Sequence, residues 1–176
     1  MRKNIGRKSW FYPLPILVIG TYDGDGTPNA VNAFYGTLCR SDMIELSISH
    51  NGSAFKNILE NKAFTVNFAD AKNVDKKRED KDKRFSKEEK ERSKFVEKSG
   101  SCKIRKRNWT AIQSKFVNAP AFEEFPVTWE CVLSRVTENG NVIGSLKNIS
   151  ADENVLNEKG VVSTEKFKKC GICFES

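Results

Sequence analysis

The sequence predicts a mainly β protein with few helices, built as a small barrel or closed sheet. At least five segments have the apolar or alternating pattern of strands, whereas only one has a convincing helical pattern. Short turns rich in Gly, Asn and Asp join successive strands, which favours antiparallel hairpins. A doubly wound α/β fold would need a helix between successive strands, so this pattern argues against one.

The first predicted hairpin has an unusual second strand. An apolar, β-branched run at residues 14–19 predicts the first strand, and Asp-Gly-Asp-Gly at 23–26 predicts a two-residue turn with positive φ angles. Residues 29–33 then carry small side chains and two amides where a core strand usually carries Val or Ile. Two interpretations remain open: an ordinary hairpin whose amides face water, or a strand that receives a polar, planar ligand.

A second candidate site lies in the next segment. A strand is expected at 43–49, followed by a loop and a helix over 54–59, with Ser53 as its N-cap and Phe55, Ile58 and Leu59 on its buried face. Ser53, the free amides of the first helical turn and Lys56 could together bind a phosphate group. The alternatives are a normally capped surface helix with a solvated lysine, and an ordinary surface histidine at His50.

Three further strands complete the predicted sheet. They are expected at 63–68, 127–136 and 141–149, with a tight turn at 137–140 between the last two. The segment 118–126 has an irregular pattern, 151–160 allows a short helix at most, and the last residues show no strong pattern. The whole chain of 176 residues is long enough for one domain with a core of its own.

The run at 75–94 differs sharply from the rest of the chain. Ten of its twenty residues are Lys or Arg and seven are Asp or Glu, and Phe85 is its only apolar side chain. Such a run cannot bury a core face, so we expect an exposed helix or a disordered excursion there, extending over 75–108.

The net charge of +7 and the hydropathy indicate which partners and which location to expect. The excess of basic residues lies mostly in segments at 2–8, 103–107 and 166–169, with no nucleic-acid recognition motif, and the acidic residues of the charged run would repel phosphates. Nucleic acid is therefore not an expected partner. No apolar run approaches the roughly 20 residues of a membrane span, and no signal peptide is evident, so a cytoplasmic protein is expected.

Five cysteines at scattered spacing do not describe a disulfide framework. Cys39 and Cys131 lie in apolar, strand-like runs and are expected to be small buried side chains. Cys170 and Cys173 form a CxxC pair, but a structural zinc site would need further ligands and a redox motif would need a thioredoxin-like βαβ pattern. We expect no metal site, and the role of this pair stays open.

Many segments, taken in order, resemble the flavin reductase-like family, whose members include flavoredoxin. The similarity covers about two thirds of the chain, and no single segment is a signature by itself. The resembling segments are Pro-Ile-Leu-Val-Ile-Gly-Thr-Tyr-Asp at 15–23, Asp-Gly-Thr-Pro-Asn-Ala-Val-Asn-Ala at 25–33, and the segments 42–50, 56–67, 69–74, 114–120, 123–131 and 148–153.

The resemblance implies a split β-barrel that binds FMN non-covalently and forms a homodimer with the flavin near the subunit interface. It also implies an oxidoreductase or electron-transfer protein, reduced by a nicotinamide or by a protein electron donor. The sequence contains no GxGxxG fingerprint, so a nicotinamide would bind transiently. No side chain needs to act as a nucleophile or general base, and we name no catalytic residue.

The same resemblance implies which residues bind the cofactor. The strand at 29–33 would lie beside the isoalloxazine ring, Tyr35 would form a flat wall where the family usually has Trp, and the segment 50–56 would receive the ribityl phosphate. The complete set is Asn29, Ala30, Val31, Asn32, Ala33, Tyr35, Gly36, Thr37, Ser49, His50, Ser53 and Lys56.

The charged run departs from the family pattern, because family members have an apolar, glycine-containing helix at this place. The departure motivates an alternative function, a split-barrel remnant that has lost flavin binding and serves as an interaction protein. A third possibility is a basic, nucleic-acid-binding barrel, which would bind with strong salt dependence.

Overall fold

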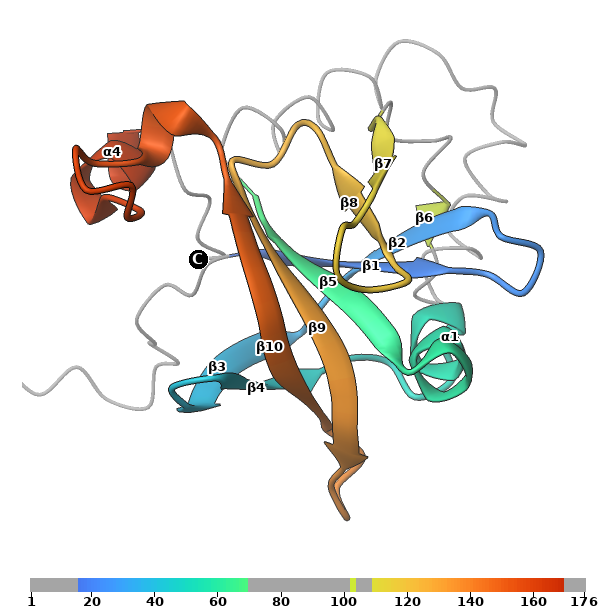
Figure 1. The fold of residues 1–176 in the computed structure, drawn as a ribbon. Helices are drawn as coiled ribbons and strands as arrows, with labels where there is room; N and C mark the ends of the chain where they lie inside the picture. Colours follow the sequence, from blue (N-terminus) through green and yellow to red (C-terminus); the bar gives the residue numbers. More distant parts are fainter. Residues whose placement is uncertain (1–15, 70–101, 104–108, 170–176) are drawn as a thin grey trace, which may run out of the picture.

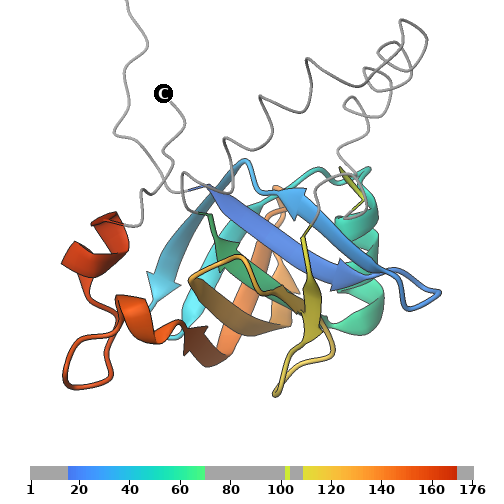
Figure 2. The same ribbon diagram turned by 90° about the horizontal axis from the view of Figure 1, so that it is seen from above.

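The computed structural model describes residues 16–69, 102–103 and 109–169 of the chain. Its main element is an antiparallel eight-stranded sheet in the order β3-β4-β10-β9-β5-β1-β2-β6. This sheet curls, so that β3 and β4 run across the direction of β9 and β10 (Figures 1 and 2). The predicted fold class, mainly β with few helices, is confirmed.

Most elements of the fold are short. The strands of the main sheet are β1 (Leu17–Tyr22), β2 (Pro28–Asn32), β3 (Tyr35–Arg40), β4 (Met43–Ser47), β5 (Ala63–Phe68), β6 (Cys102–Lys103), β9 (Val127–Val136) and β10 (Val142–Ala151). Strands β7 (Ala111–Gln113) and β8 (Pro120–Phe122) form a second, two-stranded sheet. The described helices are α1 (Ser53–Asn61), the 3-10 helix η2 (Glu153–Val155) and α4 (Thr164–Lys169).

The strands with buried apolar positions agree with the sequence predictions. β5 and β9 have the predicted bounds, and β1, β4 and β10 overlap their predicted segments. Several elements were not predicted: β3, for which only a strand-like run at Cys39 was noted, β6, α4, and the β7–β8 pair, whose second strand falls in the segment interpreted as irregular. Five of the six residues of β3 are exposed, so this strand lacks the periodic apolar pattern on which the predictions depend.

The first hairpin closes with a different turn from the predicted one. Asp23 N–H donates to Thr27 O (2.9 Å), and Gly26 N–H donates to Asp23 O (2.8 Å), so the loop has three residues. Of these, only Gly26 has a positive φ, +79°, as expected for a type I turn followed by a left-handed residue. The prediction of a two-residue turn was wrong.

Strands β1 and β5 are buried on both faces of the sheet. One face of β5 places Phe64 and Val66 in the main core, together with Ile19, Leu46 and Ile58. The other face carries polar side chains that all find partners within the described structure. Their hydrogen bonds are Asn67 Nδ2 to Val18 O (3.0 Å) and Thr65 Oγ1 (3.0 Å), Thr128 Oγ1 to Asn67 Oδ1 (2.8 Å), and Thr65 Oγ1 to Pro120 O (2.5 Å).

The segment that covers this polar face approaches β1 very closely at Gly20. A Cβ at this position would collide with Pro120 O and with Thr65 Oγ1, the two atoms joined by a hydrogen bond. The glycine therefore allows β8 to lie directly against the centre of the sheet. Phe122 of β8 and Phe125 pack against Trp109 and form a separate aromatic cluster.

Cys39 and Cys131 have opposite environments. Cys131 is completely buried, as predicted, and burial together with the negative charge of Glu130 raises its pKa to about 12. Cys39 is exposed, so the prediction of a buried side chain was wrong. It lies on β3 at the edge of the sheet, where five of the six side chains are exposed among the described residues.

Several predictions fall outside the described residues. The charged run at 75–94 lies there entirely, as do Cys170 and Cys173, and of the expected excursion over 75–108 the structure describes only β6. None of the helices within the described ranges is long and apolar enough to cross a membrane.

We expect Gly20→Ala to lower the free energy of unfolding by about 1–3 kcal/mol, since the added methyl group would displace β8 and break the Thr65–Pro120 bond. Gly24→Ala is the matched control: it has no neighbour within 4 Å and no positive φ, so it should change stability by less than about 0.5 kcal/mol. Urea denaturation measures both. Equal effects of the two variants would contradict the close approach.

Thiol labelling tests the two cysteine environments. Iodoacetamide at pH 8.5, followed by peptide mapping, should modify Cys39 and leave Cys131 unmodified until denaturant is added, because the buried Cys131 thiol with its raised pKa stays protonated at this pH. Modification of both at the same rate in the native protein would contradict the structure.

Candidate functional site

The two candidate stretches of the sequence meet at one small hollow. Its lining comes from the end of β2 and the bend that follows it, from the loop after β4, and from the start of α1. The lining residues are Val31, Asn32, Phe34, Ile48, Ser49, Gly52 and Ala54. The structure thus brings together segments that lie about 20 residues apart in the sequence.

The hollow is too small to enclose a ligand. Its volume is about 40 Å³, whereas small-molecule sites usually measure roughly 300–1,000 Å³. The described residues around this hollow, called the wall below, therefore do not form a closed pocket. Three of the predicted residues, Val31, Asn32 and Ser49, lie in this wall.

Asn29 and Ala30 are buried beneath the wall instead of facing it. Asn29 is 1% exposed and Ala30 is fully buried. Strand β2 at these two positions lies between β1 on one edge and β6 on the other. The side chain of Asn29 reaches α1, where its Nδ2 donates to Ser53 Oγ at 2.8 Å. Its Oδ1 is buried and accepts no hydrogen bond from the described residues.

The helix begins one residue earlier than predicted. Gly52 is the N-cap, no side chain caps the helix, and Ser53 is its first residue, so the prediction of Ser53 as the N-cap was wrong. Gly52 N–H donates to Ser49 O (3.0 Å), which turns the chain into the helix. Because Ser53 Oγ accepts from Asn29, the Ser53 hydroxyl proton is left to donate to a different group.

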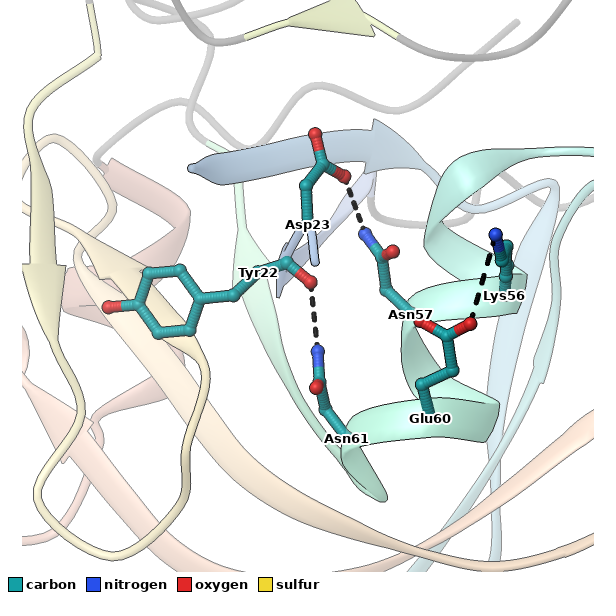
Figure 3. A network of polar contacts seen from close by, with 6 residues as sticks. All are labelled: Tyr22, Asp23, Lys56, Asn57, Glu60 and Asn61. Carbon is teal, nitrogen blue, oxygen red and sulfur yellow. Dashed lines mark hydrogen bonds and ion pairs between the residues drawn. The ribbon is translucent and has the colours of Figure 1, made fainter. Parts of the chain in front are cut away.

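A row of polar side chains docks α1 against the first hairpin (Figure 3). Ser53, Asn57 and Asn61 are spaced four residues apart and therefore lie on one side of the helix. Asn57 Nδ2 donates to Thr21 Oγ1 (3.0 Å) and to Asp23 Oδ1 (2.8 Å), and Asn61 Nδ2 donates to Tyr22 O (2.8 Å). The sequence analysis missed this row, although its spacing of four residues was visible.

The buried face of α1 matches the predicted one only in part. Ile58 is buried and Phe55 packs partly buried against the core, as predicted, whereas Leu59 is 38% exposed. The other buried residues of the helix are Ala54 and Asn57. The side-chain amides of Asn57 and Asn61 turn toward the hairpin, and this orientation of the helix leaves Leu59 partly exposed.

Lys56 and His50 make other contacts than phosphate binding would require. The Lys56 side chain is 76% exposed, and its Nζ lies 3.8 Å from Glu60 Oε1 (Figure 3). His50 packs its ring on Phe55, with centroids 5.1 Å apart, and against Gly140 of the β9–β10 turn. Neither side chain lines the hollow. An exposed ion pair such as Lys56–Glu60 is weak, so Lys56 can reorient at little cost.

The predicted residues of β3 do not line the hollow. Tyr35 OH accepts from Asn141 Nδ2 (3.1 Å) and lies 3.5 Å from Glu45 Oε1, and Asn141 Nδ2 also donates to Glu45 Oε1 (2.7 Å). Gly36 faces the core, and Thr37 is exposed. The aromatic side chain at the hollow is instead Phe34, which is 71% exposed and which the sequence analysis did not single out.

The wall has an apolar part and a part with backbone N–H donors from the start of α1. Val31, Phe34 and Ile48 suit the face or edge of a flat, apolar ring. The first N–H groups of α1, with the Ser53 hydroxyl, suit an anion. Among the described residues, no cluster of three or more His, Cys, Asp or Glu is arranged to hold a metal ion.

Comparisons with known proteins identify the family and the fold. The family described as "Flavin reductase like domain" matches residues 8–171. Flavoredoxin of Desulfovibrio vulgaris (Miyazaki F) is similar in structure, with a TM-score of 0.76 and 25% sequence identity over 100% of this chain and 88% of that chain. A comparison of the sequence with functionally curated proteins found no match.

Two more distant structures share the fold. Nitrilotriacetate monooxygenase component B from Bacillus cereus has a TM-score of 0.68 and 18% identity, over 96% of this chain and 89% of that one. The FMN-binding protein from Thermus thermophilus has a TM-score of 0.61 and 18% identity, over 92% of this chain and 86% of that one. The fold is thus a split barrel like that of flavoredoxin, and the match over nearly the whole sequence shows that the chain belongs to the flavin reductase-like family.

Proposed function

We propose that this protein binds FMN non-covalently and acts as a flavin reductase-like oxidoreductase or electron-transfer protein. One observation carries the proposal: the end of β2 and the N-terminal end of α1 line the same hollow. Membership of the flavin reductase-like family supports a flavin-related oxidoreductase function. The structural similarity to an FMN-binding protein favours FMN as the flavin.

The residues present fit the two ends of this cofactor. The phosphate would accept hydrogen bonds from the Ser53 hydroxyl and from the first N–H groups of α1, with Lys56 turning from Glu60 to add a positive charge. The ring would lie along Val31 and Asn32 with Phe34 beside it. The bound flavin supplies the redox chemistry, while the protein binds it, orients it and shields it from water.

The electron donor would be a nicotinamide or another protein. The sequence has no dinucleotide-binding fingerprint, so a nicotinamide would have to stack transiently on the open face of the flavin. The shallow hollow is consistent with such an open face, because the described wall covers only one side of a ligand.

A homodimer would provide further enclosure of the flavin. Phe34 at the hollow is 71% exposed, and Leu38 on the edge strand β3 is 55% exposed. Large apolar side chains that are exposed together often mark an interface. A second subunit placed over β3 would cover both of them and would close the site from the outside.

Titration with FMN tests the proposed cofactor. The purified protein should quench FMN fluorescence and show the visible absorbance of a bound flavin. Ser53→Ala should weaken FMN binding by roughly tenfold through loss of a charge-assisted hydrogen bond, and should leave the binding of riboflavin, which has no phosphate, unchanged. Ser134→Ala, at an exposed position on β9, is the matched control and should change neither affinity.

A protein that neither carries flavin nor takes up added FMN would exclude this function. That result would favour the alternative of a split-barrel remnant. Equal weakening of FMN and riboflavin binding in Ser53→Ala would instead place the phosphate elsewhere, while leaving FMN as the cofactor.

Light scattering tests the proposed dimer. The protein should have twice the 19.9 kDa mass of one chain, and Phe34→Asp should shift it toward the monomer, because a carboxylate would be buried in the interface. Phe116→Asp is the control, since Phe116 is similarly exposed (64%) but lies in the β7–β8 loop. A monomeric wild-type protein would rule out this arrangement.

A further inference from the structure

Both strands of the first hairpin hold the first two turns of α1 through amide side chains. From β2, Asn29 Nδ2 donates to Ser53 Oγ (2.8 Å). Toward β1, Asn57 Nδ2 donates to Thr21 Oγ1 (3.0 Å) and Asp23 Oδ1 (2.8 Å). Ser53 and Asn57 lie one helical turn apart, so these bonds act on the same part of the helix, next to the hollow.

Asn57 is an unusual choice for its position. It is 4% exposed and lies between two apolar residues of the buried face, where an aliphatic side chain would pack without needing partners. Apolar packing alone tolerates small rotations and shifts of a helix, whereas two hydrogen bonds from one amide group determine both its rotation and its height above β1. The position of the Ser53 hydroxyl and of the first N–H groups depends on that placement.

We infer that Asn57 is a positioning residue for the phosphate end of the flavin site. This inference rests on the proposed function. Asn57 would not touch the cofactor, because its Nδ2 donates to Asp23 Oδ1 (Figure 3) and to Thr21 Oγ1 on the side of the hairpin. It also does not line the hollow. It acts by holding the N-terminal end of α1, which would bind the phosphate, at a suitable distance from β2, which would bind the flavin ring.

The same helix offers a matched control in Asn61. Asn61 also uses its Nδ2 to bind the hairpin, at Tyr22 O, but it is the last residue of α1, two turns from Ser53. Asn57→Ala thus removes amide hydrogen bonds to the hairpin from the middle of the helix, one turn from Ser53, and Asn61→Ala removes one from its C-terminal end. Both should lower the melting temperature, but only the first should displace the phosphate end.

The test compares the affinities of each variant for FMN and for riboflavin at a temperature well below melting. Asn57→Ala should lower the ratio of FMN affinity to riboflavin affinity roughly three- to tenfold. Asn61→Ala should leave the ratio at the wild-type value. A general loss of structure would weaken both flavins alike, so the ratio separates positioning from mere destabilisation.

Asp23→Ala provides an independent variant, since it removes an acceptor of the Asn57 bond without changing α1. It should lower the ratio in the same direction, also in case Asn57→Ala does not fold. An unchanged ratio in a folded Asn57→Ala or Asp23→Ala variant that still binds FMN would overturn the inference alone. Absence of flavin binding by the wild-type protein would overturn the proposed function with it.

Discussion

Burial of β1 and β5 on both faces is the constraint on which the rest of the described structure depends. A strand covered on both sides needs an apolar layer on one face and either apolar or fully hydrogen-bonded groups on the other. Here the second face carries Thr65 and Asn67, whose hydrogen bonds reach β1, β8 and β9. Leaving such a buried group without a partner would cost about 1–3 kcal/mol, so these side chains determine where β8 lies. Gly20 is required because β8 then lies too close for any side chain.

The same kind of interaction places the candidate site. Apolar contacts from Ala54 and Ile58 attach α1 to the core, but they do not specify its rotation. The amides of Asn57 and Asn61 do so, because hydrogen bonds have preferred distances and directions. As a result, the start of α1 lies beside the end of β2, and the hollow forms between them. The wall thus follows from the docking of one helix onto one hairpin.

Sequence reasoning succeeded where a residue's neighbours along the chain determine its structure. Strands β5 and β9 were predicted with their observed bounds because their apolar pattern is strong. It failed where partners distant in the sequence decide. Ser53 is a residue type that favours the N-cap, yet its hydroxyl oxygen accepts a hydrogen bond from Asn29 and Gly52 is the N-cap. Leu59 has the helical spacing of a core residue, yet it is partly exposed. Strand β3 was missed because an exposed edge strand has no apolar periodicity.

The sequence by itself determined the family, the mainly β fold class, and the two stretches that form the candidate site. The family follows from the order of the resembling segments, and the fold class and the two stretches follow from local residue patterns. Only the tertiary structure decided which of their side chains face the hollow. It buried Asn29 and Ala30, directed His50 onto Phe55, and put Phe34 rather than Tyr35 at the wall. The physical reason is that the direction of a side chain depends on the twist of its strand and on the partners packed against it, and these come from segments far away in the chain.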